Sequence, residues 1–402
     1  MKILLVHQNF PGQFRELAPE LLLRGHDVRS LSMRAEGKIG GVLNHSYKPE
    51  RSSTRDLHPW LVNTESALIR AEAAARAADL IARSGWTPDL VFGHTGWGEM
   101  MFMRQVFPRA RILSFNELFY RSEGGDVGFD PEFPKDDAAP MRLQVRNLHL
   151  LSSLMASDEG VTPTDWQASC FPDELRKRLR VIHDGIQTDK LKPDRGSWVT
   201  LGRDQKKLHF GDELVTFVNR NLEPMRGFHQ FMRAVPEILS RRPNARVVIV
   251  GGNDVSYGAR PPKGQTYKDI YMSEVKDRID FSRVHFVNRV PYPVLINLFN
   301  VSAVHVYLTV PFVLSWSMME AMSVGALMVA SDTAPVKEVI THGENGLLVD
   351  FFRPDSLAQT IVQCLENPKS HEHLRLAARQ TIVQGYDFKS VCLPKYLSWL
   401  DA

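Results

Sequence analysis

Two consecutive series of short apolar segments, alternating with helical patterns, place the strongest constraint on how this chain folds. The expected strands of the first series are 2–6, 26–32, 90–92, 111–115, 160–162 and 180–182. Those of the second series are 214–219, 246–251, 284–287, 303–307, 327–330 and 347–349. Such alternation is typical of βαβ units, whose parallel strands are buried on both faces. The sequence therefore predicts an α/β protein with two Rossmann-like domains that face each other across a cleft.

A polar stretch separates the two series and sets the expected domain boundaries. Residues 192–210 contain Pro193, Gly196 and Gly202 and show little regular periodicity. We therefore expect a first domain over 1–190, a linker over 191–210 and a second domain over 211–385. A helical pattern with aromatic residues follows over 386–402.

Length, charge and cysteine content restrict the class of protein. At 402 residues the chain exceeds what one hydrophobic core usually supports, and its formal net charge of +3 is too small to indicate nucleic acid as a partner. The three cysteines are too far apart for metal-site spacing and odd in number, which fits a reducing compartment. No apolar run is long enough for a membrane span or a signal peptide. These features predict a cytoplasmic protein with at most peripheral membrane contact.

The segment 312–346 carries the most specific pattern for a binding site. A short helical pattern over 315–324 contains the carboxylate Glu320 and ends at Gly325. A buried apolar run over 326–330 follows, and Ser331-Asp332-Thr333 stands at its carboxyl end, where open α/β sheets bind ligands. A glutamate in such apolar surroundings is costly without a partner, so a ligand or a cation is expected beside it.

This segment resembles the donor site of the retaining glycosyltransferases of family 4, which have the two-domain GT-B fold. The matching residues are Glu-Ala-Met at 320–322, Gly325, Val-Ala-Ser at 329–331, Glu338 and the Gly-Glu-Asn-Gly close at 343–346. The family's E-x7-E motif is altered, because Phe312 stands where its first glutamate would be. Leu327-Met328 and Ala334-Pro335 also replace the family's Pro-Val and Gly-Gly pairs. In this fold the terminal helix 386–402 would pack back on the first domain.

Two arginines after the first strand of the second domain form a candidate diphosphate site. Arg220 and Arg226 are six residues apart across a strand-to-helix turn, and the helix N-terminus adds partial positive charge. A pair of solvated arginines is the plainer alternative. The pattern resembles the family's R-x5-K-G element, with Arg226 in place of lysine, and this implies a catalytic and diphosphate-binding role for both arginines.

The resemblance implies further donor-binding residues along the second domain. Glu320 would bind ribose hydroxyls, although a helix-surface glutamate would give the same pattern. Asn253 follows the second strand near the expected nucleotide, and Arg289 and Val290 lie in a turn that would contact the base. The segment Phe312, Val313, Leu314 and Ser315 would face the transferred sugar and its phosphates. No metal is expected, because no D-x-D motif is evident in these segments.

In the first domain, Gly12 and His94 follow the first and third expected strands. Gly12 permits close approach of backbone amides to a ligand, or it simply forms a tight turn. His94 could hydrogen-bond a sugar hydroxyl or stabilise developing charge, although a lone histidine is more often structural. The family's active-site histidine follows the corresponding strand, which implies a catalytic role for His94. Glu99 would cap the next helix or act as an acceptor-side carboxylate.

A long loop over 116–133 supplies the other acceptor-side candidates, Glu117 and Tyr120. Carboxylates and aromatic faces together suit sugar binding, whereas an Ω-loop packed on its own aromatic residues is an equally good interpretation.

Taken with the resemblance, these residues imply a nucleotide-sugar-dependent transferase whose partners are a carbohydrate, lipid-linked or small-molecule acceptor. No cofactor beyond the nucleotide sugar is expected. A degenerate GT-B protein that binds without turnover is one alternative, raised by Phe312. A nicotinamide-linked oxidoreductase is another, but the sequence lacks a G-x-G-x-x-G motif after its first strand.

Overall fold

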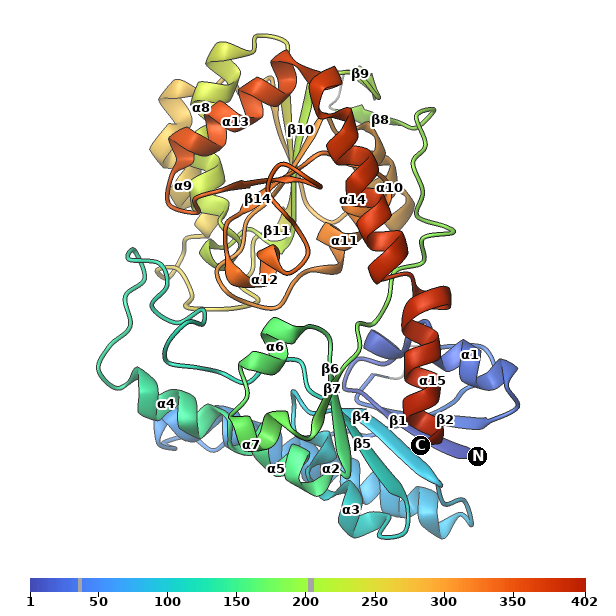
Figure 1. Cartoon of the computed structure of the whole chain (residues 1–402). Helices are drawn as coiled ribbons and strands as arrows, with labels where there is room; N and C mark the ends of the chain where they lie inside the picture. The colour runs from blue at the N-terminus through green and yellow to red at the C-terminus, as the bar shows by residue number, and fades with distance from the viewer. Residues whose placement is uncertain (35–37, 202–205) are drawn as a thin grey trace. The chain divides into compact units, whose positions relative to one another are not determined.

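The chain forms two compact units, each built around its own parallel sheet. A computed structural model describes residues 1–34, 38–201 and 206–402 (Figure 1). One unit comprises residues 1–184 together with 392–402, and the other comprises residues 185–391. The predicted α/β class with two Rossmann-like domains is confirmed, because both sheets have the doubly wound strand order.

Among the described residues, the N-terminal unit contains a 7-stranded sheet in the order β3-β2-β1-β4-β5-β6-β7, and all neighbours are parallel. Its strands are β1 (Lys2–Val6), β2 (Asp27–Ser32), β3 (Leu43–Ser46), β4 (Leu90–His94), β5 (Arg111–Phe115), β6 (Glu159–Thr162) and β7 (Leu179–Val181). The strand order reverses between β1 and β4. Their carboxyl ends therefore flank the switch point at which such sheets bind ligands.

Helices cover both faces of this first sheet. On one face, the Phe92 ring of β4 contacts Phe14 and Trp399, with ring centroids 5.0 and 5.3 Å apart. On the other face, strand residues such as Leu4 and Val91 share a core with Met100. The first layer holds η1 (Gly12–Phe14), α1 (Leu17–Leu23) and α15 (Leu393–Asp401); the second holds α2 (Val62–Arg83), η3 (Glu99–Phe102), α3 (Met103–Val106) and α5 (Leu148–Ala156). The helices η2 (Pro59–Leu61), α4 (Ala139–Arg146), α6 (Asp165–Ser169) and α7 (Asp173–Arg176) complete the described part of the unit.

The C-terminal unit repeats this arrangement around a 6-stranded parallel sheet in the order β12-β11-β10-β13-β14-β15. Its strands are β10 (Leu214–Asn221), β11 (Arg246–Gly252), β12 (Val284–Val287), β13 (Val304–Tyr307), β14 (Met328–Ser331) and β15 (Leu347–Val349). Here the order reverses between β10 and β13, so the loops after these two strands meet at the second switch point.

Two helical layers also cover the second sheet (Figure 1). The Phe217 ring of β10 stacks on Phe231 of one layer at 4.6 Å, whereas Val218 faces a core that includes Met318 and Met322 of the other. One layer holds α8 (Phe228–Arg241), α9 (Tyr267–Val275) and α13 (Pro354–Glu366); the other holds α10 (Tyr292–Val301), α11 (Trp316–Ser323) and α14 (Glu372–Gly385). The short helices η4 (Pro224–Arg226), η5 (Lys276–Arg278), α12 (Ala334–Lys337) and η6 (Pro368–His371) lie between these elements in the chain.

Three features differ from the sequence-based expectation. The edge strand β3 was not predicted, because Leu43 is the single apolar residue in its sequence. Strands β8 (Trp198–Leu201) and β9 (Lys206–His209) form an antiparallel pair within the predicted linker, of which residues 202–205 lie outside the described part. Val199, Leu201 and Leu208 belong to the core of the C-terminal unit, which explains why this polar stretch folds regularly. The last helix begins at Leu393, after a π-helical turn η7 (Phe388–Cys392).

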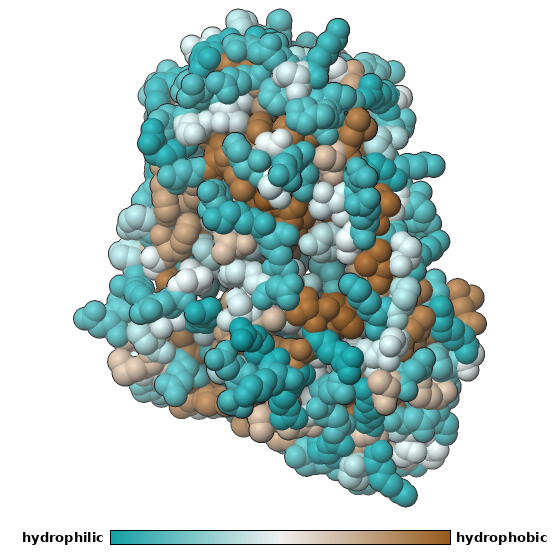
Figure 2. All heavy atoms as spheres, in the orientation of Figure 1, coloured by the Kyte–Doolittle hydropathy of each residue, from teal (hydrophilic) through white to brown (hydrophobic). Residues whose placement is uncertain are grey.

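Among the described residues, no helix is both long enough and apolar enough to cross a bilayer. Figure 2 shows one face of the molecule, on which hydrophilic residues predominate and apolar residues form smaller groups.

Candidate functional site

Gly227 allows the start of α8 to approach the end of β13 at the second switch point. It has a left-handed backbone conformation, with φ of 65°, and immediately follows η4. A Cβ atom added here would lie 2.4 Å from Leu308 Cβ. Glycine is therefore required both by conformation and by space, and it fixes the position of the preceding Arg226.

Arg226 is buried and held rigidly by one half of its guanidinium group. Its Nη1 donates to Tyr307 Oη at 3.3 Å, to Thr309 Oγ1 at 2.8 Å and to the Val313 carbonyl at 3.0 Å. Its Nε and Nη2 donate no hydrogen bond to any residue that the structure describes. Such a fork, pinned on one side with donors left on the other, suits a phosphate group.

The loop after β13 brings Phe312 against this arginine. Phe312 is only 4% exposed, and its ring lies 4.8 Å from the Tyr257 ring and 5.4 Å from the Arg226 guanidinium carbon. Arg226 also lies 5.6 Å from the Tyr257 ring. The position that resembles the family's first glutamate is thus part of an aromatic pair beside a cation.

The same loop carries backbone amides that are not used by the protein. Within the described ranges, the N–H groups of Phe312, Val313 and Leu314 donate to no residue. Ser315 caps α11 by accepting from the Ser317 amide, and its own N–H donates to Tyr307 Oη at 2.9 Å. The free amides and the Arg226 fork together provide donors for an anion.

Glu320 has the partner that its burial requires. It is 5% exposed on α11, and its Oε1 accepts a hydrogen bond of 2.7 Å from the Tyr292 hydroxyl at the start of α10. The sequence did not identify Tyr292. Its place directly after the Val290-Pro291 turn is the one signal that could have suggested it.

The remaining predicted donor residues lie at carboxyl ends of neighbouring strands. Arg220 is exposed near the end of β10, and its side chain makes no hydrogen bond or ion pair with another described residue. Asn253 directly follows β11, and Arg289 and Val290 follow β12; Asn253 and Arg289 are exposed, and Val290 is half-buried. The structure therefore brings Arg226 together with Phe312 and Val313, and Tyr307 links Arg226 to Ser315. It places the others along the same edge of the sheet.

Glu223 is a further residue that sequence reasoning missed. It is 1% exposed, and its Oε2 accepts from the amides of Ser256 at 3.1 Å and Tyr257 at 2.9 Å. Burial raises the pKa of this carboxyl group. Asn221 Nδ2 adds a bond of 2.8 Å to Ser256 Oγ. Asn221 at the end of β10 and Glu223 just after it thus fasten the segment that carries Tyr257.

In the N-terminal unit, His94 lies at the carboxyl end of β4 with a defined hydrogen-bonding state. Its Nδ1 accepts from the Gly96 amide at 2.9 Å, and burial holds its pKa well below the ordinary value. The neutral ring therefore carries its proton on Nε2. This atom has no hydrogen-bond partner in the described part of the chain, and Glu117 Oε2 lies 3.8 Å from it. His94 is thus poised as a hydrogen-bond donor.

His7, which was not predicted, lies beside His94 across the first switch point. The two rings are 5.3 Å apart, and Trp97 stacks on His94 at 4.5 Å. His7 Nε2 bonds Gln13 Oε1 at 2.7 Å, and burial lowers its pKa to about 4. A Cβ added at Gly12, where φ is 45°, would lie 2.3 Å from this ring. The predicted glycine therefore makes room for the imidazole.

Glu99 has neither of the roles that were weighed from the sequence. It is fully buried, its carboxylate accepts a hydrogen bond from the Tyr47 hydroxyl, and no side chain caps η3. Burial raises the pKa of Glu99. The acceptor-side interpretation finds no support here, because the carboxylate points into the core of the unit.

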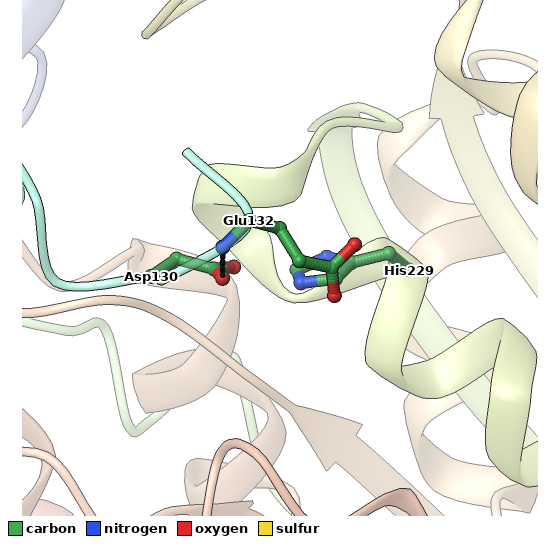
Figure 3. Close-up of side chains that lie close together, drawn as sticks. All are labelled: Asp130, Glu132 and His229. Carbon is green, nitrogen blue, oxygen red and sulfur yellow. Dashed lines mark hydrogen bonds between the residues drawn. The ribbon is translucent and has the colours of Figure 1, made fainter. Parts of the chain in front are cut away.

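The loop after β5 contains the other acceptor-side candidates. Tyr120 packs on Arg146, whose guanidinium lies 3.8 Å from the ring centre and donates to the hydroxyl at 2.9 Å. Glu117 is half-buried near His94. Figure 3 labels Asp130 and Glu132 of the same loop, where the Glu132 amide donates to Asp130 Oδ1 at 3.0 Å. It also labels His229 of the other unit, which packs against Tyr271 and Phe351.

Two family models match successive parts of the chain. Residues 24–191 match the glycosyl transferase family 4 group, and residues 202–381 match glycosyl transferases group 1. Both matches agree with the glycosyltransferase class that the sequence predicted.

Curated relatives match the chain at low identity. Spore coat protein SA of Bacillus subtilis is 25% identical over 238 residues, which is 56% of this chain and 58% of the relative. A D-inositol 3-phosphate glycosyltransferase of Corynebacterium efficiens is 26% identical over 195 residues, which is 48% of this chain and 44% of the relative. The chain thus spans about half the length of these relatives.

Solved structures confirm the GT-B fold. Anabaena HepE in complex with UDP-glucose superposes with a TM-score of 0.70 at 13% identity, covering 100% of this chain and 99% of that one. Sucrose-phosphate synthase from Thermosynechococcus elongatus gives a TM-score of 0.69 at 16% identity, covering 100% and 98%.

Proposed function

Because both parts of this GT-B chain match glycosyltransferase families, we propose that it transfers a sugar from a nucleotide diphosphate sugar to a glycan, glycolipid or small-molecule acceptor, with retention of configuration. The nucleotide-sugar donor is further supported by HepE, which was solved with UDP and with UDP-glucose.

The observation that carries this proposal is the half-used guanidinium of Arg226. When the bond between sugar and phosphate breaks, negative charge develops on the leaving diphosphate. Arg226 Nε and Nη2 and the amides of Val313 and Leu314 are fixed before the ligand arrives, so they stabilise this charge with little reorganisation. Arg220 adds a second cation at the same strand end. In this proposal the arginines neutralise the diphosphate without a metal ion.

The other residues take complementary roles. Glu320 accepts hydrogen bonds from the ribose, and Tyr292 holds its carboxylate in place. Asn253 and the turn at Arg289 and Val290 lie at the strand ends on the expected base side. His94, as a neutral Nε2–H donor, binds a sugar hydroxyl and is not a general base.

The proposal is tested first by binding and then by turnover. A panel of nucleoside diphosphates and nucleotide sugars is screened by thermal unfolding, since a ligand at ~100 times its dissociation constant stabilises the native state by roughly 2.7 kcal/mol. The matching nucleotide sugar is then incubated with acceptors, and release of nucleoside diphosphate is measured. If none of these ligands raises the unfolding temperature of the chain, the proposal is contradicted.

A degenerate protein that binds without turnover is the second candidate, favoured by the phenylalanine at position 312. It predicts the same thermal stabilisation but no release of nucleoside diphosphate, either by transfer or by hydrolysis. NAD and NADP serve as controls, because stabilisation by these dinucleotides alone would instead indicate an oxidoreductase.

A further inference from the structure

The helices α4 and α5 of the N-terminal unit carry a row of uncharged side chains on their solvent side (Figure 1). Only Asn147 separates the two helices, and its backbone is itself in the right-handed helical region. After Pro140, the exposed residues of both helices are Met141, Gln144, Leu148, Leu151 and Met155. Their spacings alternate between three and four residues, which places them on one face of a helix. We call these five residues the outer stripe.

The outer stripe is unusual because the helices that carry it are apolar on both sides. Leu143, Leu150 and Leu154 are buried, as the inner face of a surface helix usually is. The opposite side of such a helix ordinarily carries charged residues. Here, the four apolar members of the outer stripe are between 37% and 55% exposed. A contiguous apolar row that faces solvent marks an interaction surface.

The charges around the outer stripe indicate what kind of surface it meets. Residues 139–156 contain two arginines and no aspartate or glutamate. Arg142 pairs with Asp136 at 3.1 Å, whereas Arg146 forms no ion pair with any residue that the structure describes. At the far end of the stripe, Arg178 Nη1 donates to Met155 Sδ at 3.4 Å and is likewise unpaired among the described residues. Apolar side chains beside a positive excess complement a surface with anionic head groups over an apolar interior.

A second copy of the chain fits the outer stripe less well. A stable protein interface usually buries about 800 Å² per partner, from roughly 20–30 residues a side, whereas the stripe consists of five residues. Two copies paired through their stripes would also bring the unpaired arginines of both copies towards one another. A lipid surface requires neither a matching shape nor a matching set of side chains.

We propose that the outer stripe docks the N-terminal unit on the surface of a bilayer that contains anionic phospholipids. Its four apolar side chains enter the boundary between head groups and acyl chains, and Arg146 and Arg178 lie at the level of the lipid phosphates. The two helices thus lie in the plane of the surface and do not cross the bilayer. The inference goes beyond the proposed function, and its test requires no nucleotide sugar.

Vesicle co-sedimentation of the full chain is the first test. Vesicles of phosphatidylcholine alone are compared with vesicles made of equal parts of phosphatidylcholine and phosphatidylglycerol. We expect the chain to bind the anionic vesicles at least about 10-fold more tightly than the neutral ones, and added salt to weaken this binding. Equal binding to both kinds of vesicle, or binding to neither, would overturn the inference.

Variants then test the role of the stripe. The double variant Leu148→Gln/Leu151→Gln should bind anionic vesicles roughly 10- to 50-fold more weakly, because the exposed parts of both leucines no longer enter the apolar region. Arg178→Gln should weaken binding by about 5-fold. The matched control is Leu23→Gln/Leu376→Gln, at leucines of α1 and α14 that are 80% and 65% exposed, and it should bind like the wild type. An equal loss in this control would mean that apolar residues bind vesicles regardless of position, and the inference would be wrong.

A fluorescent label on the stripe gives a readout that does not depend on losing the interaction. The three native cysteines are buried, so Leu151→Cys and the control Leu376→Cys can each be labelled selectively with an environment-sensitive fluorophore. Anionic vesicles should shift the emission of the label at position 151 to shorter wavelength and leave that at position 376 unchanged. A chain that binds vesicles without this shift docks through another surface. A wild-type chain that ignores vesicles and sediments as a dimer, which Leu148→Gln/Leu151→Gln separates, has its stripe covered by a second copy. Either result overturns the inference.

Discussion

At the residue scale, Arg226 is the point on which the donor-site contacts converge. Three protein oxygens fix its Nη1, and the rings of Tyr257 and Phe312 lie beside it. Its other two nitrogens donate to no residue that the structure describes. Its planar fork can therefore be pinned and still bind, which the single ammonium group of a lysine does less well. Tyr307 and Thr309 accept hydrogen bonds from Arg226 and so hold an arginine at the position where the similar family element has lysine.

Replacing either arginine should weaken nucleoside diphosphate binding by roughly 1.5–3 kcal/mol, the usual contribution of a charge-assisted hydrogen bond. Arg220→Ala should leave stability within about 0.5 kcal/mol, because Arg220 is exposed, whereas Arg226→Ala should also destabilise the fold. Calorimetric binding and urea unfolding measure the two effects. Arg241→Ala, on the exposed side of α8, is the matched control. Unchanged affinity in both variants would refute the diphosphate role.

Tyr292 gives a second residue-scale prediction, because its hydroxyl holds the Glu320 carboxylate. Tyr292→Phe should reduce the preference for a ribonucleoside diphosphate over its 2′-deoxy and 3′-deoxy forms by about 5- to 10-fold, consistent with about 1 kcal/mol for one hydrogen bond. Glu320→Gln should reduce that preference as well, and the double variant should lose less than the sum. Tyr267→Phe, whose hydroxyl bonds the Ala259 carbonyl, serves as the control. A preserved ribose preference in Tyr292→Phe would show that the tyrosine only fills space.

At the scale of elements, the two switch points show how short turns place helices against strand ends. Near β10 and β13 the critical feature is the left-handed Gly227, and near β1 and β4 it is Gly12 beneath His7. In both cases a Cβ atom would collide with a neighbouring side chain. These turns therefore fix the distance between a helical segment and the adjacent strand.

Gly227→Ala should destabilise the C-terminal unit and weaken nucleotide binding together, because Leu308 and the start of α8 must separate. We expect about 1 kcal/mol from the left-handed conformation and roughly 1–3 kcal/mol from overpacking. Gly264→Ala separates these terms, since Gly264 has φ of 86° but no atom within 4 Å of an added Cβ. Urea unfolding of both variants gives the difference. Equal losses would mean that the contact with Leu308 relaxes freely.

At the scale of the whole molecule, each unit contains a buried neutral histidine in its sheet region. Burial lowers the pKa of His7 to about 4 and that of His305 to about 3, from 6.5. In the unfolded chain both would be protonated below about pH 6.5. The folded state binds fewer protons in this window, so its stability is full above pH 6.5 and declines as the pH falls.

Each histidine should contribute a slope of about 1.4 kcal/mol per pH unit between roughly pH 6.5 and 4.5. His305→Gln should remove one such contribution from the C-terminal unit, because glutamine can still bond Thr216 but does not titrate. Unfolding free energies at pH 7, 6 and 5 measure the slope. If the unfolding free energy of the variant changes with pH as steeply as that of the wild type, His305 does not contribute to the pH dependence of stability.

The sequence by itself determined the two series of strands and helices, because continuous apolar runs and 3.6-residue periodicity are local signals. It also placed Arg226, Gly12 and His94 after strands and Glu320 on a helix. The binding roles given to these residues came from the family resemblance and stay predictions. The sequence pattern missed β3 and β9, whose side chains are largely polar, and β8, a short strand within an otherwise polar stretch. Each of the three forms through pairing with another segment.

Only the tertiary structure decided which side chains meet across elements. Three contacts show this: Tyr292 with Glu320, Glu223 with the amide of Tyr257, and Tyr257 with Phe312. In each of them the two residues are 28 or more positions apart in the sequence. The burial that turns Glu99 inward and keeps His94 neutral likewise depends on neighbours from other strands and helices. Hydrogen bonding and desolvation act over a few ångströms in space, so their partners leave no periodic trace along the chain.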